Sequence, residues 1–335
     1  MEKKKVCVAV IGGGSWATAV VKILRDNKHP KEICWWLRNE EAVESIRNEG
    51  RNPNYLRAVK LELDRENISS DIHFVIKKAD VIILNVPAAF LEAALKGVSS
   101  EELAGKILVS AIKGIVPEKN QIIAEYLQRQ YEVPVNNIAN ISGPCHAEEI
   151  SQEKLSYLTV ASQAPEVSAL IASYINTEYV RTSISNDIYG IEYSAVLKNI
   201  YAVAVGICRG LGYGDNFQAV LVSNAIREIA RFIQVAHPIG RDSNDSAYLG
   251  DLLVTAYSLF SRNRTFGSLI GKGFSVKAAQ FEMAMVAEGY YASKSVHEIN
   301  QFHEVEMPIC EAVYEILYKN ESARSKMISL TKTLK

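Results

Sequence analysis

Residues 8–20 read VAVIGGGSWATAV, an apolar run that ends in three glycines and continues with helical spacing. The run predicts a β-strand over Val6–Ile11, and the spacing after the glycines predicts a helix over Ser15–Arg25. A strand, a glycine turn and a helix in this order form the first half of a βαβ unit. The stretch therefore predicts an α/β fold with a parallel sheet.

The glycine turn carries the pattern Gly12-x-Gly14-x-x-Ala17. The first glycine permits a tight turn, the second lets the backbone approach a pyrophosphate, and the small Ala17 allows close helix–strand packing. The N-terminus of the following helix attracts phosphates. We expect this turn to bind a dinucleotide, and the alternative is a glycine turn with a structural role only.

The choice of dinucleotide depends on the end of the second strand, about 20 residues further on. An NAD site would place an acidic residue there, whereas this chain has Arg38 within the segment WWLRN. A guanidinium suits the 2′-phosphate of NADP(H), because it can form two charge-assisted hydrogen bonds. NADP(H) is therefore favoured, with NAD(H) as a second cofactor. The alternative is a surface arginine paired with Glu40 or Glu41.

The chain divides into a first half in which predicted strands alternate with helices and a second half with helical patterns. The predicted strands and helices are followed after residue 185 by helical patterns alone, which indicates a Rossmann-type doubly wound sheet and then an all-α domain. We place the dinucleotide-binding domain at residues 1–185 and the helical substrate and catalytic domain at 186–335. The further strand predictions are Ile33–Leu37, Val81–Val86, Ile107–Ala111, Ile138–Ser142, Tyr157–Ser162 and Tyr179–Arg181, and the main helical ones are Glu40–Glu49, Ile188–Cys208, Asn216–Val235, Ala247–Phe260, Val276–Val286 and Ile309–Tyr318.

Composition narrows the class of protein. The 335 residues are 48% hydrophobic and 22% charged, with a net charge of −1, which is ordinary for a soluble globular protein and gives no nucleic-acid or membrane-surface signature. The five cysteines are scattered without metal-ligand spacing, so we expect no metal and a reducing cytoplasm. We do not expect the start MEKKKVCVAVIGGG to be a signal peptide, because its apolar stretch is short and ends in glycines. No uninterrupted apolar run reaches transmembrane length. The apolar helical domain could also supply the contact surface of a homodimer, and this expectation stays open.

Lys198 is the only charged residue between Glu192 and Arg209, in the run YSAVLKNIYAVAVGIC. A helix this apolar belongs in a core, where an ammonium group loses solvation and its pKa shifts. A lysine with a shifted pKa can act as an acid or a base near neutral pH. The alternative is a lysine whose stem carries its charge out to the surface.

Asp251 and Thr255 lie one helical turn apart in the segment GDLLVT. The surrounding residues are apolar, so we expect Asp251 to be buried and to need a cation, for which Lys198 is the candidate. A helix-capping aspartate is the alternative. Both side chains of this helix face are predicted to contact the substrate.

Four further segments carry polar groups at predicted strand or helix ends. Lys113 in SAIKG follows a strand at the sheet edge where ligands bind, or is a solvated loop lysine. The segment SGPCHAEE forms a fixed turn in which His146 is better interpreted as a loop or packing residue than as a general acid. Ser261, Arg262 and Asn263 offer donors suited to a phosphate, or form a basic surface turn. Glu288 could accept from a ribose or an amide, or be a helix-end charge.

In the order of these segments, the chain resembles the bacterial NAD(P)-dependent glycerol-3-phosphate dehydrogenases over nearly its full length. SAVLKN and SRNRTFG are the specific motifs, while the glycine turn is shared by many dehydrogenases. The matching segments are GGGSWATAV, WWLRN, NPNYL, NVPAAF, SAIKG, SGPCHAEE, SAVLKNIYAVAVGI, GLGYGDN, LGDLLVTAYSLFSRNRTFG, VAEG and MPICEAVYEIL.

The resemblance implies roles for individual residues. Lys198 matches the residue that accepts the proton when the alcohol is oxidised. Positions that match substrate contacts are Lys113, Gly143, Cys145, Asp251, Ser261, Arg262 and Asn263. Positions that match cofactor contacts are Ser15, Trp16, Arg38, Lys113, Ala147, Arg262, Val286 and Glu288.

The chain departs from the family pattern in three places. Ser194 stands where the family usually has glycine, and Cys145-His146 replaces a hydroxyl residue followed by an aromatic one. Asp245–Tyr248 replaces a glycine-rich stretch before the LGDL motif. The last two departures leave the shape of the substrate loop open, and none removes a predicted catalytic group.

The resemblance implies reversible hydride transfer between NADPH and dihydroxyacetone phosphate, giving sn-glycerol 3-phosphate for phospholipid synthesis. Two other functions remain as alternatives at this point. One is an enzyme of the same plan that reduces a different small ketone or aldehyde acid, since fold does not fix substrate. The other is a redox-sensing protein that binds the nucleotide without turnover, which would need no buried lysine–aspartate pair.

Overall fold

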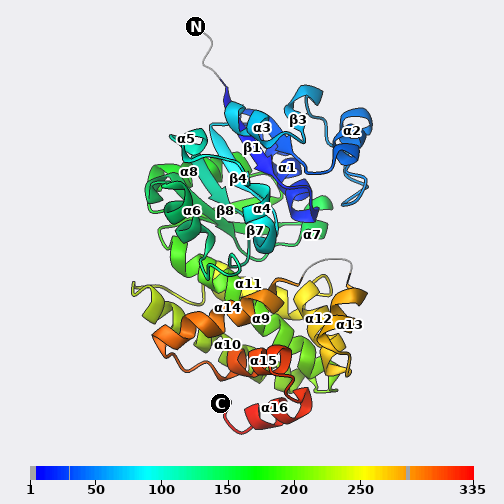
Figure 1. Cartoon of the computed structure of the whole chain (residues 1–335), viewed down its shortest axis with the longest axis vertical. Coiled ribbons are helices and arrows are strands. Elements are labelled where there is room, and N and C mark those ends of the chain that lie inside the picture. Colours follow the sequence, from blue (N-terminus) through cyan, green and yellow to red (C-terminus); the bar gives the residue numbers. More distant parts are fainter. Residues whose placement is uncertain (1–4, 30, 284–286) are drawn as a thin grey trace. The chain divides into compact units, whose positions relative to one another are not determined.

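The computed structural model describes residues 5–29, 31–283 and 287–335. The chain forms two compact units, each of which is described by itself (Figure 1). Unit 1 consists of Met1–Ile112 and Ile123–Ile188, and unit 2 of Lys113–Ile122 and Tyr189–Lys335. The division of roles at 185/186 stays a prediction.

Unit 1 is built on an eight-stranded sheet with the order β3-β2-β1-β4-β5-β6-β7-β8. All neighbouring strands pair in parallel except β6 and β7, which are antiparallel. The predicted α/β fold with an all-helical second half is confirmed. The strands are β1 (Val6–Ile11), β2 (Lys31–Trp36), β3 (Ile68–Ser69), β4 (Val81–Leu84), β5 (Ile107–Ser110), β6 (Ile138–Ser142), β7 (Ser156–Ala161) and β8 (Val180–Ser185).

The sheet is wound in both directions from β1. The chain runs from β1 outward to β3, then returns to the other side of β1 and continues from β4 to β6. Because parallel crossovers are right-handed, this reversal puts helices on both faces and buries the strands. The helices of unit 1 are α1 (Ser15–Asp26), α2 (Glu40–Glu49), α3 (Ile72–Lys78), α4 (Leu91–Ala94), α5 (Ser100–Leu103), α6 (Ile123–Tyr131), α7 (Ala147–Ser151) and α8 (Pro165–Ile175).

The sequence patterns found the long strands but missed the short β3. Strand β3 has only two residues, too few for an alternation to be visible. The helices α3 to α8 of this unit were also not predicted, and neither were three helices of unit 2, Arg262–Gly271, Glu288–His303 and Ala323–Leu330. Tyr157–Ser162 and Tyr179–Arg181, which we expected to extend the sheet at its far edge, do so as β7 and β8.

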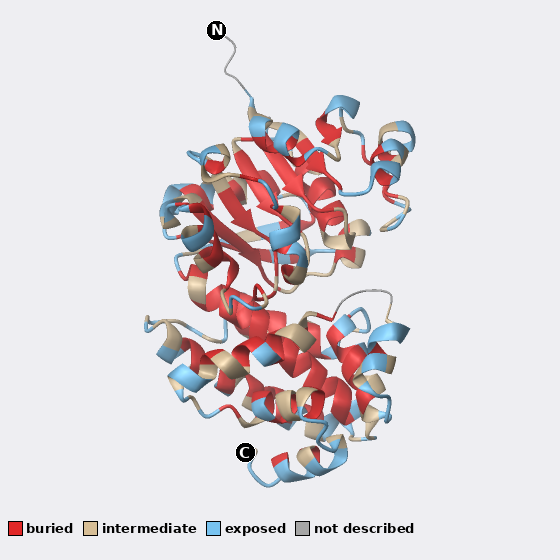
Figure 2. Cartoon of the chain, viewed as in Figure 1, coloured by how far each residue is buried: buried red, intermediate tan, exposed pale blue. Residues whose placement is uncertain are grey.

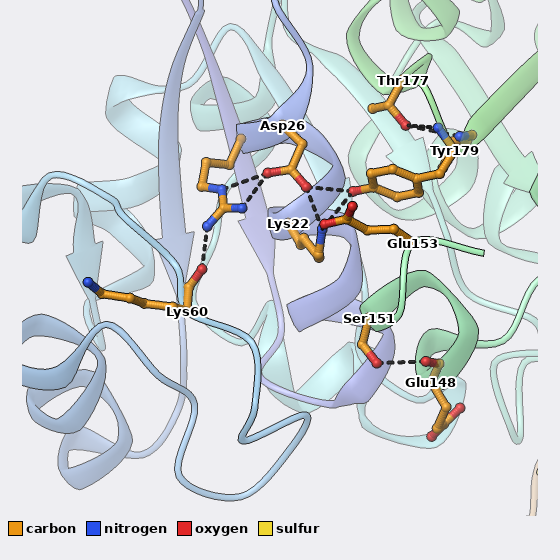
Figure 3. A network of polar contacts seen from close by, with 10 residues as sticks. Lys22, Asp26, Lys60, Glu148, Ser151, Glu153, Thr177 and Tyr179 are labelled. Carbon is orange, nitrogen blue, oxygen red and sulfur yellow. Dashed lines mark hydrogen bonds and ion pairs between the residues drawn. The ribbon is translucent and has the colours of Figure 1, made fainter. Parts of the chain in front are cut away.

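A buried ion network holds α1 against the last part of the sheet (Figure 3). Lys22 is 4% exposed, and its Nζ donates to Asp26 Oδ2 at 2.5 Å, to Glu153 Oε1 at 2.8 Å and to the Tyr179 hydroxyl at 3.2 Å. The Tyr179 hydroxyl in turn donates to Asp26 Oδ2 at 2.7 Å. Since Lys22 has carboxylate and hydroxyl partners, its burial does not leave an uncompensated charge.

Unit 2 is helical throughout its described residues, apart from one isolated β-bridge between Val116 and Gln121. Its central helix α9 (Ile188–Gly210) is buried along most of its length (Figure 2). By length and composition α9 could cross a membrane, yet its apolar window is completely buried, as in the core helix of a globular unit. The other helices are α10 (Asp215–Ala236), α11 (Asp251–Tyr257), α12 (Arg262–Gly271), α13 (Val276–Glu282), α14 (Glu288–His303), α15 (Pro308–Tyr318) and α16 (Ala323–Leu330).

Helix α12 touches α9 backbone to backbone. A Cβ atom on Gly206 of α9 would lie 2.1 Å from the carbonyl oxygen of Arg264, and one on Gly267 of α12 would lie 2.1 Å from that of Val203. Real Cβ contacts are never this short, so only glycine fits at the crossing. The start of α12 is thereby fixed relative to the helix that carries Lys198.

The helix predicted over Ala247–Phe260 is shorter and begins differently. Ser246–Gly250 forms a π-helical turn, α11 covers Asp251–Tyr257, and Ser258 adopts an extended conformation. The helix stops because Arg264 Nη1 donates to the carbonyl oxygens of Tyr257 and Ser258, both at 3.0 Å. The π-helical turn includes part of the segment that departs from the family pattern.

Glu228 of α10 is a buried carboxylate that the sequence patterns did not single out. It is 1% exposed and accepts hydrogen bonds from Ile309 N at 2.8 Å, Cys310 N at 3.3 Å and the Tyr201 hydroxyl at 3.1 Å. It therefore caps the first turn of α15 from a neighbouring helix. Burial raises the pKa of Glu228 to about 7, although these hydrogen bonds act in the opposite direction.

This pKa predicts a pH dependence of stability. Between pH 4.5 and pH 7 the folded protein holds a proton on Glu228 that the unfolded chain releases, so raising the pH destabilises the fold. We expect the free energy of unfolding of the wild type, relative to Glu228→Gln, to fall by up to about 3 kcal/mol across this range. Denaturant unfolding of both proteins at several pH values measures this difference in the free energy of unfolding. If the difference did not change with pH, the raised pKa of Glu228 would be contradicted.

Candidate active site

The glycine turn of unit 1 has the geometry of a phosphate-binding loop. Gly12 has φ +138°, and a Cβ atom there would lie 2.3 Å from the carbonyl oxygen of Asn85. Gly14, by contrast, has nothing within 4 Å of its Cβ position, and α1 begins at the next residue, Ser15. The turn is thus closed on the sheet side and open where a pyrophosphate would approach the helix N-terminus.

Two polar groups at this turn fit a bound dinucleotide. Trp16, in the first turn of α1, has a buried Nε1 without a hydrogen-bond partner among the described residues, so it can donate to a ligand. Asn52 fixes the turn itself, because its Nδ2 donates to Gly13 O at 3.0 Å and to Thr18 Oγ1 at 2.8 Å. Asn52 was missed as a functional residue, although the motif NPNYL that contains it was recognised.

Arg38 is exposed just after β2, where the sequence predicts contact with the adenosine ribose. Within the part of the chain that the structure describes, it forms no ion pair with Glu40 or Glu41. Glu40 instead accepts a hydrogen bond from Ser70 Oγ, and Asn39 caps α2 by accepting from Ala42 N at 3.0 Å. The guanidinium therefore stays available for an anion.

The other predicted residues of unit 1 follow β6. Gly143 is buried in the turn, and Cys145 is half-buried against the apolar core of the unit. Ala147 is 7% exposed and begins α7, with His146 at the N-cap position. The contacts of Gly143, Cys145 and Ala147 with substrate or cofactor stay predictions.

In unit 2 one carboxylate lies between two ammonium groups. Asp251 is 1% exposed, and its Oδ1 accepts a short hydrogen bond from Lys198 Nζ, so the predicted pair is present. Lys113 Nζ lies 3.2 Å from Asp251 Oδ2. The Lys198 side chain is only 4% exposed and therefore does not carry its charge to the surface.

Burial and the Lys113 ammonium group both affect the protonation of Lys198 and Asp251. Loss of solvation lowers the pKa of Lys198 to about 7, and the Lys113 ammonium acts in the same direction, whereas Asp251 opposes the shift. Burial alone would raise the pKa of Asp251, but the two ammonium groups outweigh it and hold this pKa below its ordinary value. Lys198 can therefore both donate and accept a proton near neutral pH.

A chain of amide hydrogen bonds connects the predicted substrate and cofactor residues of unit 2. Asn199 Nδ2 donates to the carbonyl oxygen of Lys113 at 2.7 Å, and its Oδ1 accepts from Asn263 Nδ2 at 2.8 Å. Asn263 Oδ1 accepts from Gly289 N at 2.9 Å. The structure thus brings together the Lys113 segment, α9, the start of α12 and the start of α14. Asn199 gave no separate signal in the sequence beyond its place next to Lys198.

The residues around α12 differ in their exposure. Ser261 caps the helix, with its Oγ accepting from Arg264 N, while Arg262 is exposed at the first helical position. Thr255 Oγ1 donates to the Asp251 carbonyl oxygen at 2.6 Å. Glu288 is half-buried at the start of α14, and Val286 lies outside the described residues.

A mostly parallel sheet whose first strand leads into this glycine turn is typical of NAD(P)-dependent dehydrogenases. Comparison with known families and structures identifies the group more narrowly. The N-terminal model of the NAD-dependent glycerol-3-phosphate dehydrogenases matches residues 7–168, and the C-terminal model matches residues 187–327.

Individual relatives agree with the family models. A glycerol-3-phosphate dehydrogenase [NAD(P)+] from Syntrophomonas wolfei is 33% identical, with 99% of this chain and 95% of the relative covered. One from Staphylococcus carnosus is also 33% identical, with 93% of each chain covered. The crystal structure of glycerol-3-phosphate dehydrogenase from Coxiella burnetii superposes with a TM-score of 0.90 at 26% identity, covering 98% of this chain and 99% of the other. The chain belongs to the NAD-dependent glycerol-3-phosphate dehydrogenase family and is an NAD(P)-dependent oxidoreductase.

Proposed function

We propose that this chain catalyses reversible hydride transfer between NADPH, or NADH, and dihydroxyacetone phosphate, with Lys198 as the general acid and base. The observation that carries the proposal is the buried cluster of Lys198, Asp251 and Lys113. A lysine with a pKa near neutrality in the core of unit 2 has the protonation behaviour that a ketone reductase needs.

When bound, the dinucleotide would supply the hydride for the carbonyl carbon. Lys198, as an ammonium group, protonates the oxygen on which negative charge develops, and its neutral amine then regains a proton from solvent. In the oxidation direction the neutral amine takes the proton of the alcohol. A pKa of about 7 supports both directions, because neither protonation state is rare at neutral pH.

Asp251 and Lys113 adjust this proton transfer. The Lys113 ammonium adds positive charge beside Lys198 and would stabilise the developing oxyanion. Asp251 orients the Lys198 amine through its short hydrogen bond. Its negative charge also stabilises the ammonium groups of Lys198 and Lys113 next to each other.

We assign the substrate phosphate to Arg262, with Ser261, Asn263 and Thr255 around it. Arg262 is exposed at the N-terminus of a ten-residue helix, where both the guanidinium and the helix dipole favour an anion. A phosphate held away from the reacting carbon turns binding energy into orientation of the ketone. Gly143 and Cys145 are the proposed substrate residues of unit 1.

For the cofactor we propose a pyrophosphate site at Gly12, Gly14, Ser15 and Trp16, with Arg38 selecting NADP(H). The open space at Gly14 and the unpartnered Trp16 Nε1 support this placement. Residues 1–185 then bind the dinucleotide, and residues 186–335 supply most of the catalytic groups. The remaining proposed cofactor contacts are Lys113, Ala147, Arg262, Val286 and Glu288.

In the cell, we propose that the product supplies the glycerol phosphate backbone of phospholipids and that the enzyme is cytoplasmic. The family relationship supports both assignments. The homodimer stays a prediction.

The function is tested by the substrate requirement. We expect loss of NADPH absorbance with dihydroxyacetone phosphate but very little with unphosphorylated dihydroxyacetone, because Arg262 holds the phosphate. Arg262→Ala should raise the KM for the phosphorylated ketone by about 10-fold or more. Equal activity on both ketones would favour an enzyme for another small carbonyl compound, and NADPH binding without turnover of any ketone would favour a sensor.

The role of Lys198 is tested by its removal. Lys198→Ala should lower kcat by about 10²–10⁴-fold, as expected for loss of general acid catalysis, while the Kd for NADPH stays unchanged. Lys294→Ala, an exposed lysine of the same unit, serves as the matched control and should keep full turnover. If Lys198→Ala kept nearly full turnover, the assigned role would be wrong.

The pH profile tests the electrostatics of the cluster. Ketone reduction should fall, and alcohol oxidation should rise, as the pH increases through about 7, because Lys198 loses its proton there. Asp251→Asn should move this inflection to lower pH, since Asp251 stabilises the charged amine. Lys113→Ala should move it to higher pH. Profiles of kcat/KM in both directions measure the shifts, and movement of the two variants in the same direction would refute the scheme.

A further inference from the structure

Asn85 occupies the position in unit 1 where the winding of the sheet reverses. It follows β4 directly, and β4 is the neighbour of β1 on the side opposite to β2. Its N–H donates to the Ile11 carbonyl oxygen at 2.8 Å, and its own carbonyl oxygen is the atom nearest to the Gly12 Cβ position. In open α/β sheets, ligands bind outside the carboxyl ends of the strands at this switch point.

The Asn85 side chain is buried with its donor unused. The residue is 8% exposed, and its Nδ2 has no hydrogen-bond partner among the residues that the structure describes. A buried amide that donates to nothing destabilises a protein, so such groups are rare without a functional reason. An apolar residue of the same shape would avoid this loss.

Two other buried asparagines of the same unit, Asn52 and Asn67, form side-chain hydrogen bonds within the protein. Asn52, 1% exposed, donates to Gly13 O and Thr18 Oγ1 and accepts from the N–H groups of Asn54 and Tyr55. Asn67, also 1% exposed, accepts from Lys78 Nζ at 2.8 Å. Asn85 thus differs from Asn52 in having a buried amide donor without a partner among the described residues.

We propose that Asn85 Nδ2 donates a hydrogen bond to a phosphate oxygen of the dinucleotide's pyrophosphate bridge. The assignment rests on dinucleotide binding at the Gly12 turn, as proposed above. Trp16 Nε1, one residue after the helix begins, is a second buried donor of this unit that has no partner in the described part of the chain, and Gly14 leaves the approach open. An amide donor at the switch point adds a neutral, directional contact to the backbone N–H groups of the helix N-terminus.

Two nearly isosteric variants test the assignment, with the Kd for NADPH measured by fluorescence titration and the unfolding midpoint of the unliganded protein measured in parallel. Asn85→Leu removes the donor and should weaken NADPH binding by about 10-fold or more. It should leave the unfolding midpoint unchanged or higher, because it also removes an unsatisfied buried group. Asn85→Asp places a carboxylate against the phosphate and should weaken binding further than Asn85→Leu.

Asn67→Ala is the matched control, a buried asparagine whose partner is Lys78. It should lower the unfolding midpoint and leave the Kd for NADPH unchanged. The inference is overturned if Asn85→Leu binds NADPH like the wild type, or if it loses stability and affinity together. It is also overturned if Asn85→Asp binds as well as the wild type, since a ribose hydroxyl would then be the partner. A wild type that fails to bind NADPH would instead refute the proposed cofactor site.

Discussion

The chemistry of the helical unit depends on one carboxylate that is shared by two lysines. Asp251 is 1% exposed and lies between the ammonium groups of Lys198 and Lys113, so its buried negative charge is compensated. The pKa of Lys198 is lowered because its ammonium group, on a side chain that is only 4% exposed, loses solvation. The lowered pKa of Lys198 thus follows from burial and from the neighbouring charges rather than from a special residue type.

That arrangement requires the surrounding helices to hold their positions closely. Helix α12 meets α9 through glycines, and the amides of Asn199 and Asn263 connect both helices to the Lys113 segment and to α14. Hydrogen bonds of this kind are directional, so a small shift of one helix would change the position of Lys113. The rigidity of the site is therefore a property of the backbone packing around α9.

The sequence predicted those features that produce a strong local signal. Continuous apolar runs marked β1 and β4, and an isolated lysine in an apolar helix led to Asp251 as its partner. The two-residue β3 has no periodicity to detect, and the π-helical turn at Ser246–Gly250 could not be told from an ordinary helix start. Asn52 and Asn199 were missed because their amide groups are recognised by hydrogen-bond partners that lie far away in the chain. Asn85 was missed because burial of its amide group is visible only in the folded structure.

The path of the chain has a consequence for how the two units can form. Residues 113–122 leave the α/β unit, join the helical one and return, bringing Lys113 with them, and Asn120 donates to Glu298 of α14 at 2.7 Å. A ribosome therefore delivers the first piece of the helical unit long before the remainder has been synthesised. If the chain were produced as two fragments divided at residue 185, this loop would belong to the N-terminal fragment. The helical fragment would then lack Lys113, one of the two lysines that contact Asp251.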